Sequence, residues 1–471
     1  MDSHDGKALT AATVAVAPPT VPHGLAGSQA PVGPPPALAL RGAVIDFRDD
    51  PFLVDASAAF RYEPDALVIC SDGRIQAVGP YDELAGHLPD GLTPVRYPDA
   101  LICAGLIDAH VHYVQTGIIG AYGDRLLDWL DDYTFVAEQA FADPAHASAM
   151  AGVFCRELLR NGTTSAVAFC AVYPASVDAL FEEAERRGMR MVAGKVLMDR
   201  NAPAALLDTP QRAYDESKAL IERWHGRGRA LYAITPRFAP TSSEAELDAA
   251  GALRREHPGT YVQSHLSESA DEVAWVRALF PASSDYLDVY AGHGLVGRGS
   301  IFAHGVHLTD PEWERLHETG TALAHCPTSN LFLGSGLFDL ARAKDPRRPV
   351  DVALGTDVGA GTSLSMLATM NEAYKVAALR GTHVRAVKAF YLATLGAARA
   401  LGLEDRIGTL APGTEADIVV LDPNATPFMA YRNARSASIE ETMFLLTVMG
   451  DDRAVRATYV GGRLAYERPE G

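Results

Sequence analysis

Two histidines one residue apart are the first candidates for chemistry in this chain. His110 and His112 stand in the stretch LIDAHVHYVQTG, directly after an apolar run. If this stretch is a β-strand, both side chains lie on one face and can bind the same metal ion. The pair alone is weak evidence for a metal site. With 15 histidines in 471 residues, two histidines separated by one residue can easily occur by chance. Further ligands must come from elsewhere in the chain.

Other polar residues that could complete a site stand at the ends of apolar stretches. Each has an ordinary structural interpretation as well. His265 could be a hydrogen-bonded core histidine, and Asp357 could cap a helix or brace a Gly-rich turn. Glu268 could be a solvated residue at a helix start, and Arg237 could belong to a structural ion pair. Together with the histidine pair, His265 and Asp357 would form a set of three nitrogens and one oxygen, which suits zinc or iron.

The elements that must position these residues alternate between apolar strands and helices. Eight strands are predicted, separated by helical stretches such as ASVDALFEEAERRG. Their ranges are 101–112, 163–170, 189–198, 230–238, 260–268, 300–308, 321–327 and 351–359. This alternation predicts an α/β fold with a TIM-type (β/α)8 barrel over residues 99–407. In such barrels catalytic residues lie at the C-terminal ends of the strands, where the candidates fall, so the pattern favours one metal site.

Both ends of the chain are rich in β-strand patterns. The segment ALVICSDGRIQAVG has Asp72-Gly73 between two alternating runs, and RATYVGGRLAYE has Gly461-Gly462 in the same role, so each predicts a hairpin. We therefore expect a small β-sandwich domain formed by residues 38–98 together with 408–471. Residues 1–37 are rich in Ala and Pro and are expected to form a disordered tail.

Charge and cysteine content limit the class of ligand and the compartment. The net charge of −18 repels nucleic acids and anionic membrane surfaces, so a small neutral or cationic ligand is favoured. No apolar run is long enough to span a bilayer. The five cysteines are far apart and include no C-x-x-C motif, which is typical of a reduced, cytoplasmic protein.

At these residues the chain resembles the amidohydrolase superfamily. The resemblance rests on D-x-H-x-H after a strand, on histidines at the ends of strands 5 and 6, and on an aspartate after strand 8. Five longer stretches are similar to the guanine deaminase family within it, over about residues 38–468. They are HVHYVQTGIIGAYGDRLLDWL, GKVLMDRNAP, ITPRFAPTSS, HCPTSNLFLGSGLF and GTDVGAGTSLSMLATMNEAY.

The resemblance implies a zinc-dependent aminohydrolase that converts guanine to xanthine and ammonia and assembles as a homodimer. It implies one Zn²⁺ per subunit, and Lys195 lies on strand 3 rather than on strand 4, where two-metal members carry a bridging lysine. The implied metal ligands are His110, His112, His265 and Asp357. The implied catalytic residues are Glu268 as proton shuttle, Asp357 as base and His304 beside the attacking water. The implied substrate contacts are His112, Gln115, Arg237, Phe238, His265, Glu268 and Asp357.

Two other functions stay open at this point. The metal set does not name the ring, so the substrate could be a pterin, a triazine or an oxidised purine. Alternatively, the barrel could be a non-catalytic amidohydrolase-like assembly protein. That second alternative predicts missing ligands, whereas all four ligand positions are filled.

Overall fold

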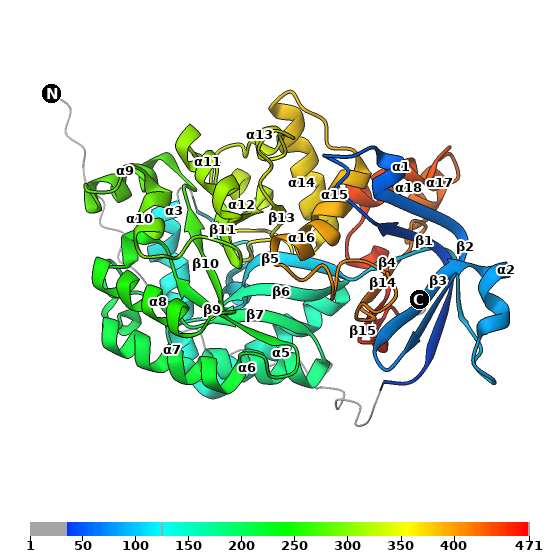
Figure 1. Cartoon of the computed structure of the whole chain (residues 1–471), viewed down its shortest axis with the longest axis horizontal. Coiled ribbons are helices and arrows are strands. Elements are labelled where there is room, and N and C mark those ends of the chain that lie inside the picture. The colour runs from blue at the N-terminus through cyan, green and yellow to red at the C-terminus, as the bar shows by residue number, and fades with distance from the viewer. Residues whose placement is uncertain (1–34, 124–125, 470–471) are drawn as a thin grey trace.

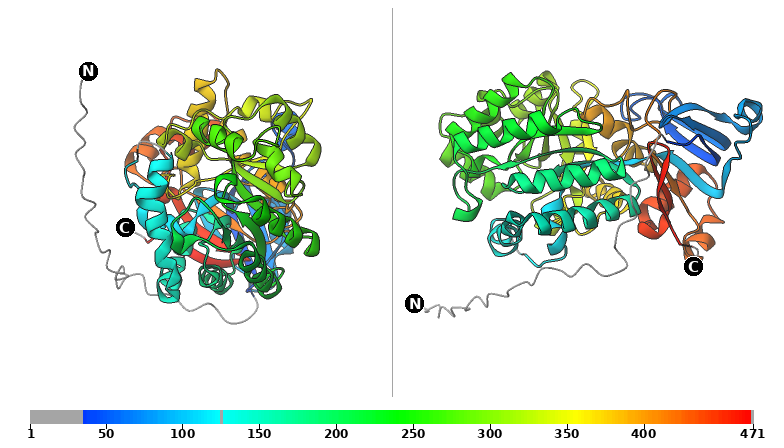
Figure 2. Two further views of the ribbon diagram at one scale, coloured as in Figure 1. Left: turned by 90° about the vertical axis from the view of Figure 1, so that its left-hand side faces the viewer. Right: turned by 90° about the horizontal axis from the view of Figure 1, so that it is seen from below.

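The structure is a computed structural model that describes residues 35–123 and 126–469 (Figure 1). Nearly all of the predicted tail, residues 1–37, lies outside the described residues. Two sheets organise the rest. One is a parallel barrel surrounded by helices, and the other is a mixed sheet that lies beside the barrel and contains both the first and the last strands (Figure 2).

Eight parallel strands form the barrel, and each corresponds to a predicted strand, which confirms the predicted α/β barrel. They are β5 (Leu106–His112), β6 (Thr163–Phe169), β7 (Arg190–Gly194), β9 (Ala230–Pro236), β10 (Tyr261–Leu266), β11 (Ser300–His304), β12 (Ala322–His325) and β13 (Val352–Leu354). A short strand, β8 (Val196–Leu197), pairs with β9. The chain after β13 returns to β5, because Asp357 N donates to His110 O at 2.8 Å and His112 N donates to Val358 O at 2.7 Å. The barrel is therefore nearly closed where the two predicted histidine ligands lie.

Helices cover the outside of the barrel (Figure 2). Those between the strands, from α5 onward, are α5 (Pro144–Arg160), α6 (Pro174–Arg187), α7 (Pro210–Trp224), α8 (Glu244–Glu256), α9 (Ala270–Leu279), α10 (Tyr286–Gly292), α11 (Asp310–Thr319), α12 (Pro327–Phe332) and α13 (Leu340–Ala343). Those after the last strand are α14 (Met366–Leu379), α15 (Ala386–Leu392) and α16 (Leu395–Ala400). Their starts follow local rules: α9, for example, has a capping box in which Ser269 and Glu272 satisfy each other's backbone N–H groups. The inward faces pack on the strands in one continuous apolar core.

Strands from both termini come together, as predicted, and they form one mixed seven-stranded sheet rather than the two layers of a sandwich. Its order is β16 (Arg463–Glu467), β15 (Val455–Val460), β14 (Ile418–Leu421), β4 (Val95–Ala104), β1 (Leu38–Phe47), β2 (Phe60–Ser71) and β3 (Arg74–Pro80). The hairpin turns at Asp72-Gly73 and Gly461-Gly462 are both present, since Ser71 pairs with Arg74 and Val460 with Arg463. Short helices α1 (Ala56–Ala59) and α2 (Tyr81–Leu84) and the C-terminal helices α17 (Pro427–Asn433) and α18 (Ile439–Met449) complete this region.

The predicted strand over residues 101–112 is two strands, β4 and β5, which belong to different sheets. The chain passes between them at Gly105, whose N–H donates to Asp417 O at 2.8 Å. A Cβ atom at this position would lie 2.2 Å from Thr164 Oγ1, so only glycine fits. The mixed sheet thus holds the chain up to Ala104, past the predicted boundary at residue 98, and β5 carries the histidines directly afterwards.

None of the helices within residues 35–123 and 126–469 combines the length and the apolar character needed to cross a membrane.

Candidate active site

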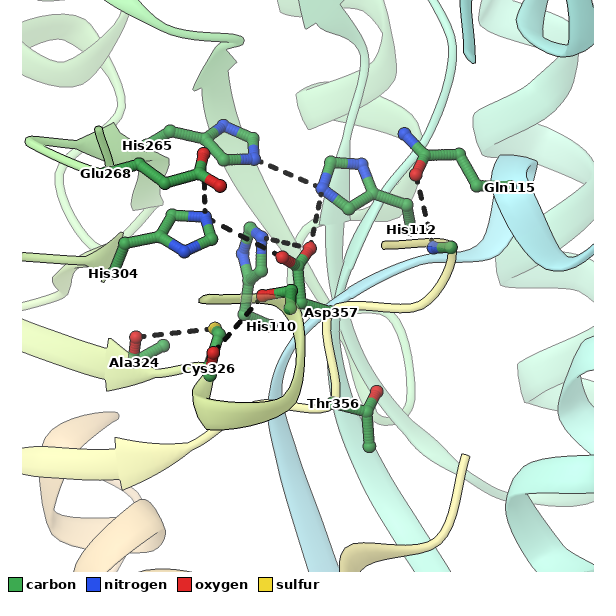
Figure 3. Close-up of polar contacts among 12 residues, drawn as sticks. His110, His112, Gln115, His265, Glu268, His304, Ala324, Cys326, Thr356 and Asp357 are labelled. Atoms are coloured by element: carbon green, nitrogen blue, oxygen red, sulfur yellow. Dashed lines mark hydrogen bonds and ion pairs between the residues drawn. The ribbon is translucent and has the colours of Figure 1, made fainter. Parts of the chain in front are cut away.

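Four buried side chains meet at one end of the barrel, where β5, β10 and β13 end (Figure 3). His110 Nε2 lies 3.1 Å from Asp357 Oδ1, and His112 Nε2 lies 3.4 Å from the same oxygen. His112 Nε2 also lies 3.2 Å from His265 Nε2. One ligand atom from each residue falls within 4.8 Å of all the others. The predicted set of three nitrogens and one oxygen is therefore assembled in space.

The hydrogen bonds around this cluster fit a bound cation. His265 Nδ1 lies 2.6 Å from Arg237 O, which can only accept, so Nδ1 carries the proton and Nε2 presents a lone pair to the cluster. Apart from its 3.1 Å approach to Asp357 Oδ1, the buried His110 Nε2 makes no hydrogen bond to any residue that the structure describes. Lone pairs of the imidazole nitrogens and of the Asp357 carboxylate thus point to one place, where no hydrogen-bond donor among the described residues pairs with them. This arrangement has the donor chemistry of a metal site.

The ionisation states of these residues also suit metal ligands. Burial lowers the pKa of His112 to about 3, and burial together with the neighbouring imidazoles holds the pKa of His265 well below its usual value. Burial alone would raise the pKa of Asp357, but His110 and the other imidazoles around it hold that pKa well below the usual range. The neutral forms of His112 and His265 and the ionised form of Asp357, which these shifts favour, are the forms that bind metal.

Asp108 braces the ligands from behind and was not among the predicted site residues. Its carboxylate accepts from Thr356 N at 2.9 Å, from Thr356 Oγ1 at 2.5 Å and from His110 N at 3.3 Å. Burial raises its pKa to about 6. The residue connects β5 to the segment after β13, so it fixes the spacing between His110 and Asp357. The D-x-H-x-H motif contained it, but the motif alone does not say what its first residue contacts.

Gly355 sets the close approach of the same two segments, and replacing it by alanine is expected to disrupt the metal site. A Cβ atom there would lie 2.8 Å from His110 Cβ and 3.0 Å from its backbone N and O. Because backbone atoms cannot move aside cheaply, we expect a loss of about 1–3 kcal/mol in the free energy of unfolding and a lower metal content. Chemical denaturation and elemental analysis measure both. Gly86→Ala is the matched control, since a Cβ there meets nothing within 4 Å. A Gly355→Ala protein with the parent's stability and metal content would contradict this account.

Glu268 and His304 lie beside the ligand cluster, at the ends of β10 and β11. His304 Nε2 is 3.5 Å from Glu268 Oε2 and 3.7 Å from Asp357 Oδ2. Ser335 Oγ donates to Glu268 Oε1 at 3.3 Å. Burial, with the nearby charges of Glu272 and Asp357, raises the pKa of Glu268 well above its usual value. A buried carboxyl of this kind can hold a proton near neutral pH and transfer it to a ligand.

A small cavity connects the cluster to the remaining predicted residues. All nine predicted site residues lie around it or, in the case of His110, directly behind it. The lining residues are His112, Gln115, Leu126, Trp129, Leu130, Arg237, Phe238, His265, Glu268, His304, Leu333, Asp357 and Ala360. His307, which also stands near the end of the sixth barrel strand, is not among these lining residues, and its Nε2 lies 2.7 Å from Ser335 O. Arg237 also forms the ion pair that was its alternative interpretation: it lies 2.7 Å from Glu138 and at the same time lines the cavity.

Comparison with known proteins agrees with this geometry. The model of the amidohydrolase family matches residues 101–465. The chain belongs to the amidohydrolase family. It is similar to guanine deaminase of Escherichia coli (strain K12), with 49% identity over 433 residues that cover 91% of this chain and 98% of that protein.

Solved structures of two guanine deaminases resemble this fold. The E. coli guanine deaminase structure has a TM-score of 0.90 and covers 92% of this chain and 100% of that one. Guanine deaminase of C. acetobutylicum with bound guanine in the active site has a TM-score of 0.82 at 27% identity, again covering 92% and 100% of the two chains.

Lys195, the lysine that bears on the number of metal ions, takes part in a separate ion-pair cluster. Its Nζ contacts Asp208 and lies 3.3 Å from Glu216 Oε2. The side chain is completely buried there. Lys195 therefore pairs with Asp208 and Glu216 and does not belong to the metal-ligand cluster.

Proposed function

We propose that this chain is a guanine deaminase that hydrolyses guanine to xanthine and ammonia with one zinc ion per subunit. The observation that carries the proposal is the buried cluster of three histidines and Asp357 in contact with a cavity that also contains Glu268, Arg237 and Gln115. The similarity to guanine deaminases over nearly the whole chain supports guanine as the substrate.

In this proposal His110, His112, His265 and Asp357 hold the metal. A zinc ion held there would supply a water nucleophile at neutral pH, which water alone does not provide. Zinc suits the site because it binds imidazole nitrogens and carboxylate oxygens, and the cluster borders a cavity that water and substrate could enter. The residues of the chain then have to move protons and orient the ring.

Glu268 is the proposed proton shuttle. Deamination adds water at C2 and expels ammonia, so the ring N3 and then the leaving amine must each gain a proton. A buried carboxyl with a raised pKa can deliver its proton to N3, take up the proton that the new C2 hydroxyl loses as the carbonyl forms, and pass that proton to the leaving amine. The proton taken from the attacking water then restores the carboxyl for the next cycle. Asp357, ionised and facing His304 across 3.7 Å, is placed to accept the proton that the attacking water loses. His304 is proposed to orient that water.

Arg237, Gln115 and Phe238 are the proposed recognition residues. Guanine has an acceptor at O6, which suits the guanidinium donors of Arg237, and its ring nitrogens suit the amide of Gln115. Phe238 is buried beside the cavity and is proposed to pack on the ring face. Three of the metal ligands, His112, His265 and Asp357, and the proton shuttle Glu268 would contact the reacting side of the ring.

Adenine should be a very poor substrate, and this comparison tests the proposal. In the pose of guanine, the 6-amino donor of adenine would face the donors of Arg237, and adenine C2 carries no amino group to expel. Deamination of adenine would therefore require a different pose, with C6 at the reacting position. We expect kcat/KM for guanine to exceed that for adenine by about 10⁴-fold. Ammonia release from guanine, adenine, a pterin and an aminotriazine, measured side by side, provides the ratios. Similar kcat/KM values for adenine and guanine would contradict the proposed recognition, and preference for a pterin or a triazine would favour the alternative substrates.

We further propose a homodimer in the cytoplasm and a division into a β domain and a barrel. The boundary predicted at residue 98 moves to Gly105, because β4 (Val95–Ala104) belongs to the mixed sheet, so the β domain comprises residues 38–104 and 408–471 and the barrel residues 105–407. The five cysteines support a reducing compartment, since all are free and buried.

A further inference from the structure

Glu138 is a buried carboxylate that none of the roles above uses. It lies in the short helix α4 (Phe135–Gln139), which follows α3 (Leu126–Trp129) and one turn of π-helix over Leu130–Thr134. Its side chain is completely buried. The carboxylate accepts from Arg237 Nη1 at 2.9 Å and 2.7 Å, one contact to each oxygen, and from Gln115 Nε2 at 3.0 Å. One carboxylate thus joins the two polar recognition residues, which come from different strand ends.

These contacts determine what the two residues can offer to a ligand. Gln115 Oε1 accepts from Gly359 N at 3.2 Å while Nε2 donates to Glu138, so the orientation of the amide is fixed at both ends. Its second N–H is the donor that remains. Arg237 uses Nη1 for both contacts to Glu138, which leaves Nε and Nη2 as its other donors. The Phe135 ring, 5.4 Å from the guanidinium carbon, packs on the same side chain.

The pairing also determines the charge of this end of the cavity. An unpaired arginine in a dry cavity would attract anions strongly. The Arg237 side chain is 3% exposed and its charge is balanced by Glu138 at 2.7 Å. The pair presents hydrogen-bond donors with almost no net charge, which suits a carbonyl oxygen on a neutral ring. An anionic ring would gain little from Arg237 and would be repelled by Glu138.

We propose that Glu138 is a positioning residue that also determines specificity: it holds Arg237 and Gln115 in place and makes this end of the site selective for neutral oxopurines over anionic ones. The inference rests on the proposed function, because it assumes that an oxopurine occupies the cavity. It has a direct consequence for turnover. Xanthine loses a proton more readily than guanine, so a charge-balanced site helps the product to leave.

The test compares two ligands that the enzyme does not deaminate. Xanthine is largely an anion at mildly alkaline pH, whereas hypoxanthine is largely neutral there. Binding of both to the metal-loaded full chain is measured by calorimetry at one such pH. Glu138→Gln removes the charge but keeps the size, so we expect the affinity ratio of xanthine to hypoxanthine to rise about tenfold or more. Glu138→Asp keeps the charge on a shorter side chain, so both ligands should bind more weakly while their ratio stays near that of the parent.

Glu312→Gln is the matched control. Glu312 is also buried, but it lies at the start of α11 and accepts from Thr309 and from Leu287 N. Its substitution removes one buried negative charge outside the cavity and should leave the ratio unchanged. An unchanged ratio in Glu138→Gln, or an equal rise in Glu312→Gln, would overturn the inference while leaving the proposed function intact. Failure of the parent chain to bind either oxopurine would overturn the inference and the proposed function together.

Discussion

Glu268→Gln is expected to lower kcat for guanine deamination about 10²–10⁴-fold while the metal content stays at that of the parent. The glutamine has the size of the carboxyl but cannot carry the acidic proton. Ser335 Oγ can still donate to the side-chain oxygen, as it does to Glu268 Oε1 at 3.3 Å, so the site should keep its shape. Steady-state rates of xanthine formation and elemental analysis of the same samples give both quantities.

The control for this substitution is Glu246→Gln. Glu246 is a completely buried glutamate in α8 that is not among the residues lining the cavity, and burial raises its pKa to about 8. Removing its ionisable group should leave kcat close to that of the parent. If Glu268→Gln retains the parent kcat, Glu268 is not the proton shuttle. A loss of metal in this variant would instead assign Glu268 a role in holding the site together.

His265→Ala is expected to abolish both metal retention and activity. The imidazole contributes one of four ligand atoms, and its Nδ1–H bond to Arg237 O fixes its orientation. Loss of residues that only support metal ligands typically weakens metal affinity 10–100-fold, so loss of a ligand should cost at least about 100-fold. Metal bound per chain after dialysis is the measurement.

His325→Ala is the matched variant for this experiment. His325 is buried, ends the barrel strand β12, and stacks on Phe338 at 4.6 Å between ring centroids. Its replacement should lower the free energy of unfolding but leave one metal ion per chain. Full metal content in His265→Ala would refute the ligand assignment.

The sequence carried most of the information about the barrel and the metal ligands. Each strand is a short apolar run, and the ligands stand where these runs end, so counting runs placed His265 and Asp357 at the same end of the barrel as the histidine pair. The split between β4 and β5 was not predictable in this way. The two strands are both apolar and are separated by Gly105 alone, and their separation depends on contacts with Thr164 and Asp417 far along the chain.

Glu138 shows the second limit of prediction from sequence. It lies in a run of short helical pieces rather than at a strand end, and its partner Arg237 is 99 positions away. Most glutamates are exposed, so nothing local marks this one as buried. The prediction for Arg237 was split between a structural ion pair and a functional residue. In the structure Arg237 has both roles, because it forms an ion pair and also lines the cavity. Predicting this from the sequence would require knowing which carboxylate contacts Arg237.

The most direct test of the central claim is the conversion of guanine by the purified chain before and after removal of its metal. We expect equal amounts of xanthine and ammonia from the metal-loaded protein, almost none after chelation, and recovery when zinc is added back. Absence of xanthine from the loaded protein, or undiminished conversion by protein shown to be free of metal, would contradict the account.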